Sequence, residues 1–137
     1  MKITAVIFDL DGTLVDTSEF IYQAYEYALT VHKLDTVPRK ILSTHIGKHL
    51  KSIYKEIAPK GNLELLVKAH FEFQAKNFHL VKNYPDVLEV IKKLKKLGIK
   101  LAIVTTRLGN TDDTLKTAGI NPDLFDVIIS GHEARPK

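Results

Sequence analysis

Two aspartates separated by one residue stand where an apolar segment of the sequence ends. Residues 3–8 are almost continuously apolar and β-branched, and Asp9, Leu10, Asp11 and Gly12 follow directly. Such a run is typical of a parallel strand that is covered on both faces. Ligands of open α/β sheets bind beyond the carboxyl ends of the strands. We therefore expect Asp9 to face a ligand crevice, and Asp11 to lie over the same spot once Gly12 lets the chain turn.

The segment from Asp9 to Asp16 resembles the signature of the haloacid dehalogenase superfamily, Asp-x-Asp-Gly-Thr-Leu-x-Asp. The positions that match it are Asp9, Asp11, Gly12, Thr13, Leu14 and Asp16. The signature fixes residue types, their spacing and the strand before them, so it outweighs the alternative of a strand followed by an acidic turn with Asp16 capping a helix. The resemblance implies an α/β fold, a Rossmannoid parallel sheet with an inserted all-helical cap, as in the phosphoglycolate phosphatase group.

The resemblance also implies the chemistry of the two aspartates. Asp9 would attack phosphorus and form an aspartyl-phosphate intermediate, which is then hydrolysed. Asp11 would protonate the leaving oxygen and later activate water. The Asp9 carboxylate and the Asp11 backbone carbonyl would hold Mg²⁺, a cation that suits oxygen ligands beside a phosphate. The implied activity is Mg²⁺-dependent hydrolysis of a small phosphorylated metabolite.

The resemblance places phosphate-binding groups after each of three strands, at Leu10, Asp11, Thr105, Thr106 and Lys137. A hydroxyl and an amide donor stabilise phosphate oxygens without competing as nucleophiles. A lysine neutralises the phosphate and the nucleophilic carboxylate together. The next residue after the threonines, Arg107, either reaches the substrate or lies on the surface.

Asp11 separates the activities found within the superfamily. The dehalogenases lack an acid at this position because halide leaves without a proton, so Asp11 favours phosphate ester hydrolysis. A phosphomutase with a similar cap is an alternative, and Thr13 favours the phosphatase. A further alternative is a catalytically incomplete fragment or a phosphate-binding module.

The resemblance stops at Lys137, whereas the family continues with strand–helix units that carry an acidic motif for the metal. We expect a truncated fragment, a natural short product, or a chain that a partner completes. The first strand is central in the family's sheet, so residues 3–8 would become an uncovered apolar edge here. Such edges pair with other chains, and we expect self-association through this strand.

The elements that position these residues follow from the hydrophobic periodicity. Helical stripes fill the segment after the first strand, over residues 20–32, from Pro38 to near Gly47, and over 50–57 and 63–78. From residue 84 a helix alternates with the buried strand 100–105, the helix 111–118 and the strand 126–129, which indicates a parallel sheet with right-handed crossovers. We expect a core of residues 1–16 and 82–137 and a helical cap of residues 17–81.

Composition narrows the function classes. The 137 residues are 45% hydrophobic and 26% charged and include no cysteine, which excludes disulfides and thiolate chemistry and suits the cytoplasm. No apolar run is long enough to cross a bilayer. The formal net charge of +4 comes from scattered lysines, and the dense group at residues 92–96 is expected to be a solvated helix face rather than a nucleic-acid site. The positive field favours an anionic substrate.

Overall fold

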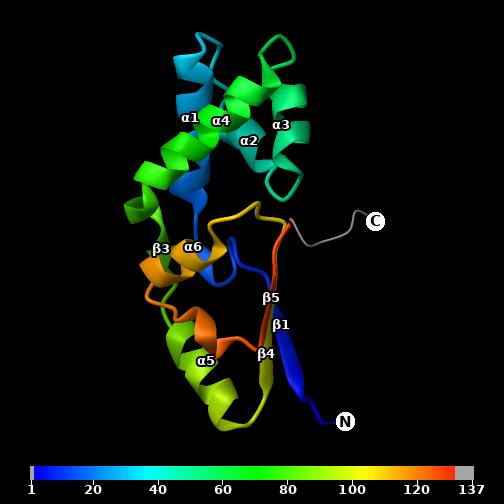
Figure 1. Cartoon of the computed structure of the whole chain (residues 1–137), viewed down its shortest axis with the longest axis vertical. Coiled ribbons are helices and arrows are strands. Elements are labelled where there is room, and N and C mark those ends of the chain that lie inside the picture. The colour runs from blue at the N-terminus through cyan, green and yellow to red at the C-terminus, as the bar shows by residue number, and fades with distance from the viewer. Residues whose placement is uncertain (1, 132–137) are drawn as a thin grey trace. The chain divides into compact units, whose positions relative to one another are not determined.

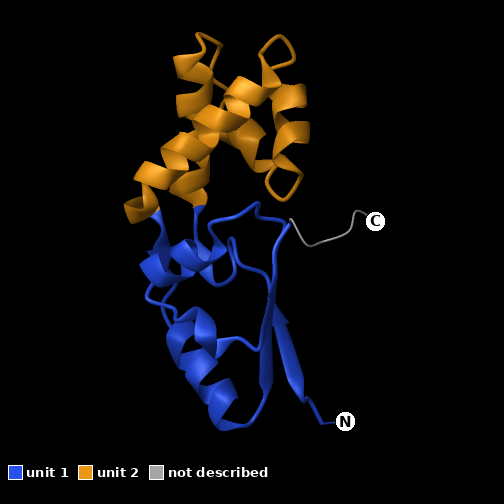
Figure 2. Cartoon of the chain, viewed as in Figure 1, with its two compact units in different colours: residues 1–17, 81–137 blue, residues 18–80 orange. Residues whose placement is uncertain are grey.

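The structure is a computed structural model that describes residues 2–131 of the chain, and its contacts divide it into two compact units. Unit 1 comprises residues 1–17 and 81–137, and unit 2 comprises residues 18–80 (Figure 2). Unit 1 carries every described residue of the predicted site.

Unit 1 is built on a parallel sheet of three strands (Figure 1). The strands are β1 (Ala5–Phe8), β4 (Lys100–Val104) and β5 (Val127–Ile129), in the order β1-β4-β5. Phe8 pairs with Ile103, and Ile103 pairs with Ile128. Because all three strands run in the same direction, their carboxyl ends meet at one edge. The predicted α/β class with a parallel sheet is confirmed.

Helices cover one face of this sheet. Figure 1 shows α5 (Val87–Lys96) and α6 (Thr111–Thr117) on the same side, with the 3₁₀ turn η2 (Pro122–Leu124). Ile91 of α5 and Leu115 of α6 are fully buried while the lysines of both helices are exposed, as an amphipathic helix requires. The fully buried side chains of this layer include Ile91, Leu101, Ile103, Leu115 and Ile120.

The opposite face of the sheet has no covering layer among residues 2–131. Ile7 is 68% exposed and Val127 is 50% exposed, and Ile3 and Val104 are exposed too. The prediction that the first strand is covered on both faces is therefore wrong for the described part of the chain. A parallel sheet normally has helices on both faces, and the crossover helices α5 and α6 supply only one layer.

A short antiparallel ribbon stands at the two sequence boundaries of unit 2. In it β2 (Val15–Asp16) pairs with β3 (Lys82–Asn83), Val15 opposite Asn83 and Asp16 opposite Lys82. The sequence did not predict this ribbon, because two residues are too few to show an alternating pattern.

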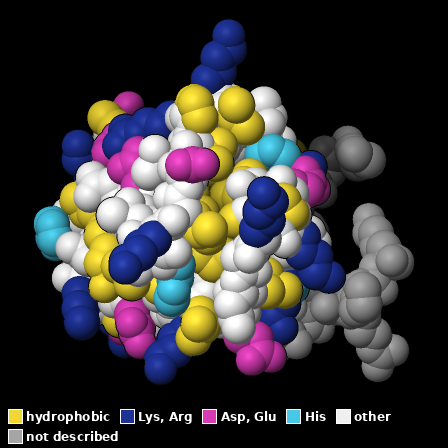
Figure 3. Space-filling view, turned by 90° about the horizontal axis from the view of Figure 1, so that it is seen from above, with side chains coloured by type: hydrophobic (Ala, Val, Ile, Leu, Met, Phe, Trp, Pro, Cys, Tyr) yellow, Lys and Arg dark blue, Asp and Glu magenta, His cyan; other side chains and the backbone are white. Residues whose placement is uncertain are grey.

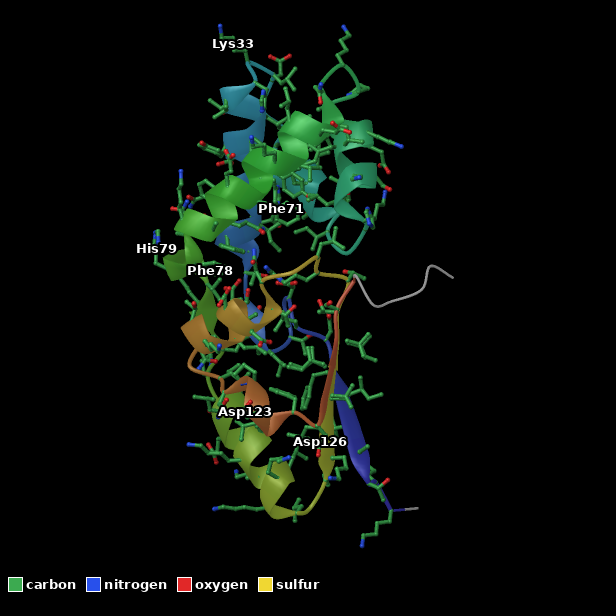
Figure 4. The ribbon with its side chains drawn as sticks, viewed as in Figure 1. Lys33, Phe71, Phe78, His79, Asp123 and Asp126 are labelled. Carbon is green, nitrogen blue, oxygen red and sulfur yellow. The ribbon has the colours of Figure 1, made fainter. Side chains whose placement is uncertain are left out.

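Unit 2 is a helical bundle. It contains α1 (Ser18–Val31), α2 (Arg39–Ser43), α3 (Leu50–Ile57), α4 (Leu63–Lys76) and the 3₁₀ turn η1 (Phe78–Leu80). The helices follow the predicted stripes, except that α2 ends at Ser43 rather than near Gly47. The rings of Phe20 and Phe78 stack with centroids 5.5 Å apart, and Phe78 is labelled in Figure 4.

A buried histidine lies in the core of this bundle. His70 is 3% exposed, and its Nδ1 lies 2.9 Å from the Tyr54 hydroxyl while its Nε2 lies 3.1 Å from Gln74 Nε2. Burial raises the pKa of both Tyr54 and Tyr25, whose rings contact each other. His70 is thus a hydrogen-bonded core residue.

The surface shows no dominant patch of one charge on the face drawn in Figure 3, where lysine and arginine side chains are scattered among hydrophobic ones. No helix of residues 2–131 is both long and apolar enough to cross a membrane.

One carboxylate of unit 1 joins the sheet to α5. Asp126, labelled in Figure 4, accepts hydrogen bonds from the Leu101 backbone N–H at 2.9 Å, from Lys100 Nζ at 3.0 Å and from Lys95 Nζ at 3.4 Å. The backbone hydrogen bond, followed by Lys100, lowers the pKa of Asp126 to about 2. These bonds fix the chain just before β5 against the start of β4.

Replacing Asp126 with Asn should therefore change the acid stability of the protein. A carboxyl group whose pKa is lower in the folded than in the unfolded state stabilises the fold fully at pH values above the unfolded-state pKa. This stabilisation is lost as the pH falls through the folded-state pKa. The wild type should be more stable than Asp126→Asn at pH 6, and the difference should shrink between pH 3.8 and about 2. Urea unfolding across this pH range measures it, with the exposed Asp123→Asn as control. A difference independent of pH would contradict the assigned contacts.

Candidate active site

The first strand end is a turn centred on Leu10. The backbone carbonyl of Leu10 accepts hydrogen bonds from the N–H groups of Thr13, Leu14 and Val15 at 2.9–3.2 Å. The side chains of Leu10 and Leu14 are almost fully buried, so the turn is anchored by apolar contacts. Gly12 has φ +75°, a conformation that glycine adopts readily. This turn leaves Asp9 exposed, and its Oδ1 accepts a hydrogen bond from Leu10 N–H at 2.8 Å.

The second strand end presents Thr105 beside the first. Thr105 follows β4 directly, is 4% exposed, and its backbone N–H donates to the Ile129 carbonyl at 3.0 Å. Its hydroxyl oxygen accepts a hydrogen bond from Arg107 N–H at 3.2 Å. Thr106 is exposed. Phe8, the last residue of β1, pairs with Ile103, two residues before Thr105.

Arg107 forms an ion pair with Asp11. Its Nε donates to Asp11 Oδ2 at 3.0 Å, and its Nη2 donates to Asp11 Oδ1. The Thr17 hydroxyl also donates to Asp11 Oδ1, at 2.6 Å. The side chain of Arg107 is 6% exposed and that of Asp11 is 22% exposed. The alternative that Arg107 lies on the surface is therefore wrong.

The third strand end is joined to the same loop. The backbone N–H of Gly131 donates to the Arg107 carbonyl at 2.9 Å. A Cβ atom at residue 131 would lie 2.5 Å from the Thr106 carbonyl oxygen, so the close approach of the two chain segments requires glycine. Lys137, the predicted phosphate-binding lysine, lies outside the described residues.

Hydrogen bonds thus unite one part of the predicted site, namely Asp11 and Thr105, through Arg107. Asp9 carries a separate hydrogen bond to Leu10 within the turn. The sequence missed both the ion pair and the contribution of Thr17. The signal for the ion pair was present, because opposite charges that follow neighbouring parallel strands are brought to the same edge of the sheet.

The oxygen groups after β1 fit Mg²⁺ in part. Asp9 offers an exposed carboxylate, whereas the carboxylate of Asp11 is bound by Arg107, which leaves the backbone carbonyl as the ligand from Asp11. Mg²⁺ takes octahedral oxygen ligands and keeps several waters, so two protein oxygens are a partial set. Residues 2–131 contain no group of three or more His, Asp or Glu side chains that could hold a metal ion.

The contact at Gly131 generates a prediction. Gly131→Ala places a methyl group against a backbone carbonyl that has no flexible side chain to move aside. The loop of residues 105–107 must shift, and overpacking of this kind costs about 1 to 3 kcal/mol. Urea denaturation measures the loss in the free energy of unfolding, and the amide resonances of residues 105–107 should move. Unchanged stability together with unchanged resonances would contradict the close approach.

Comparisons with known proteins identify the family of the chain. The family described as haloacid dehalogenase-like hydrolase matches residues 6–137. Pyrophosphatase PpaX of Bacillus cereus (strain Q1) is 33% identical over 132 residues, which cover 95% of this chain and 60% of the relative. The chain therefore spans about 60% of the length of the curated relatives that it matches first.

Solved structures show the same fold. A haloacid dehalogenase-like hydrolase from Bacteroides fragilis has a TM-score of 0.86 at 26% identity, covering 98% of this chain and 66% of that one. A structure from Haemophilus somnus, described as a predicted phosphoglycolate phosphatase, has a TM-score of 0.84, and the match covers 98% of this chain and 65% of that one. Its sequence identity is 24%, so it supports the fold alone. The family match, the α/β fold and the aspartate pair after β1 agree: the chain belongs to the haloacid dehalogenase-like hydrolase family.

Proposed function

We propose that this chain forms the nucleophile-bearing part of a phosphatase that acts on a small phosphorylated substrate. The single observation that carries the proposal is the hydrogen-bonded set at the strand ends, in which Arg107 joins Asp11 to the loop of Thr105. This set lies after two neighbouring parallel strands, and ligands of such sheets bind beyond the carboxyl ends of the strands. Asp9 follows β1 two residues before Asp11 and has an exposed side chain. Membership of a hydrolase family and relatives named as phosphatases support the same chemistry.

In the proposed reaction Asp9 is the nucleophile. One Oδ atom of Asp9 attacks phosphorus, a new O–P bond forms, and the bond from phosphorus to the leaving oxygen breaks. The leaving oxygen takes a proton from Asp11. Asp11 then removes a proton from water, which attacks the phosphoryl group and releases phosphate and the free Asp9 carboxylate.

Other groups of the chain would bind the phosphoryl oxygens. The Thr105 hydroxyl and the backbone N–H groups of residues 11 and 106 are donors that can stabilise negative charge without competing as nucleophiles. The N–H of Leu10, which donates to Asp9 Oδ1 in this structure, would join them by changing partner. We propose Lys137 as a further cationic group. When bound, Mg²⁺ would reduce the repulsion between the nucleophile and an anionic substrate, with the Asp9 carboxylate and the Asp11 carbonyl as its ligands from this chain. We propose unit 2 as the helical cap that selects substrates.

Pyrophosphate is the first substrate to test, because the curated relatives at 33% and 34% identity are named pyrophosphatases. A second candidate function is phosphate binding without turnover. It is favoured by one observation, namely that residues 2–131 lack a cluster of three acidic or histidine side chains for a metal. A phosphomutase is distinguished by transfer of the phosphoryl group to a second substrate hydroxyl rather than to water.

The test of the nucleophile is hydrolysis of pyrophosphate and p-nitrophenyl phosphate, with Mg²⁺ and with excess chelator. We expect activity in Mg²⁺, loss of that activity on chelation, and a rate for Asp9→Asn lower by at least about a thousandfold, since an amide is a far weaker nucleophile. Asp86→Asn, an exposed carboxylate elsewhere in unit 1, serves as control. Activity that persists in Asp9→Asn refutes the assigned nucleophile, and a wild-type chain that binds phosphate without turnover supports the binding function.

We also propose that the uncovered strand β1 mediates self-association with a second copy. β1 is an edge strand of the described sheet, and its Ile7 side chain is 68% exposed. An edge strand offers unpaired backbone N–H and C=O groups, and apolar side chains beside it add a dehydrated contact.

Sedimentation velocity over a range of concentrations tests this association. We expect dimers or larger species for the wild type and a shift toward monomer for Ile7→Lys, because a charge on an edge strand opposes strand pairing. Ile41→Lys, at an isoleucine that is 48% exposed in unit 2, is the matched control and should leave the distribution unchanged. A wild type that stays monomeric at all concentrations would count against the proposal.

A further inference from the structure

Arg107 is a nearly buried cation held in a fixed place beside Asp11. Its side chain is 6% exposed, and two of its nitrogen atoms, Nε and Nη2, donate to the Asp11 carboxylate. Guanidinium is always charged and presents five donors in a planar fork. An arginine that serves only to solubilise the surface would not be withdrawn from water in this way.

The backbone of Arg107 is fixed independently of its side chain. Its N–H donates to the Thr105 hydroxyl oxygen at 3.2 Å, and its carbonyl accepts from Gly131 N–H at 2.9 Å. The Cα atom is thereby positioned between two strand ends, while the side chain can change partner by rotation about its own bonds. The guanidinium can therefore exchange one anion for another without rearrangement of the loop.

The segment that carries the partner of this guanidinium is rich in negative charge. Asp9 and Asp11 both follow β1, and a phosphorylated substrate adds further negative charge. When the leaving group is an alcohol it is neutral. The leaving group of a diphosphate is itself a phosphate, which the ionised Asp11 carboxylate would repel until Asp11 carries the proton that it donates. A guanidinium within hydrogen-bonding distance of Asp11 can offset that repulsion, and arginine binds phosphate through two parallel hydrogen bonds.

We propose that Arg107 is a specificity-determining residue that moves from Asp11 to an anionic leaving group, so that the site selects diphosphates over monoesters with neutral leaving groups. This inference rests on the proposed function, because that function places the leaving group beside Asp11. In the free protein the ion pair keeps both groups satisfied. With a diphosphate bound, the guanidinium contacts the departing phosphate. Asp11, released from the ion pair, can then donate its proton to the leaving oxygen.

The first test observes the arginine directly in the full wild-type chain by ¹⁵N–¹H NMR of the arginine Nε–H groups. The Arg107 signal is identified by its absence in Arg107→Lys and should exchange slowly with water, since its Nε–H is bonded to Asp11 Oδ2. Titration with pyrophosphate should shift this signal. Methyl phosphate, at equal occupancy measured by ³¹P NMR, should leave it in place. A signal that does not respond to saturating pyrophosphate overturns the proposal.

The second test compares affinities by isothermal titration calorimetry. Arg107→Gln should weaken pyrophosphate binding by at least about tenfold and methyl phosphate binding by less than about twofold, with Arg107→Lys intermediate. Lys116→Gln, at an exposed lysine of α6, removes the same charge and should change neither affinity. Circular dichroism checks that the variants are folded. The NMR test is made on the wild type and uses a variant only to assign the Arg107 signal.

The outcomes separate this inference from the proposed function. Equal losses for the two ligands in Arg107→Gln overturn the inference, as does a wild type that binds neither ligand. If the wild type discriminates through Arg107 but hydrolyses neither compound, the inference stands as a binding specificity and the proposed hydrolysis is refuted. If hydrolysis occurs with equal kcat/KM loss on both substrates in Arg107→Gln, the proposed function stands and the inference falls.

Discussion

The ion pair between Arg107 and Asp11 is the interaction on which the geometry of the candidate site depends. It joins the turn after β1 to the loop after β4, and the carbonyl of the same arginine receives a hydrogen bond from the segment after β5. Removing one member of a buried ion pair typically costs about 3 to 5 kcal/mol because the other charge is left uncompensated. Asp11 is partly exposed, which reduces that cost here. The pair therefore acts as a structural link between strand ends and also determines what Asp11 can contact.

The parallel sheet explains why such a link can form. Parallel pairing of β1, β4 and β5 brings residues that lie far apart in the sequence to the same edge, such as Asp11 and Arg107, which are 96 positions apart. The same topology leaves the second face of the sheet without helices within residues 2–131, since the two crossover helices lie together on the other face (Figure 1). The candidate site and the exposed apolar face of the sheet therefore both result from the order in which the strands are connected.

Local patterns predicted most of the elements. The apolar run before Asp9, the helical stripes between residues 18 and 80 and the two strand–helix units after residue 84 all correspond to observed elements. The covering of β1 on both faces, inferred from the apolar run alone, was predicted wrongly, because such a run shows which strand can be buried and not whether another layer is present. The separate expectation of an uncovered edge at this strand agrees with the place of β1 in the described sheet. The ribbon of β2 and β3 was missed because its strands are two residues long.

The site was predictable only as far as motif spacing reaches. Asp9 and Asp11 were predicted from residue types at a strand end, and Thr105 from the family resemblance. The structure joins Asp11 to Thr105 through Arg107, whose role the sequence left open. The partner of Arg107 depends on which strands are neighbours and on side-chain direction, and neither is contained in a local pattern. Gly131 shows the same limit, since its need for glycine arises from a carbonyl of Thr106 that lies far from it in the sequence.

The proposal that Asp9 is the nucleophile is tested most directly by mass spectrometry. The protein is quenched with acid while it turns over pyrophosphate in the presence of Mg²⁺. We expect the peptide containing Asp9 to gain the mass of one phosphoryl group. This gain should disappear when the quenched sample is treated with hydroxylamine, which cleaves acyl phosphates. Phosphate release without any phosphorylated peptide, or a phosphoryl group on a residue other than Asp9, would contradict the proposal.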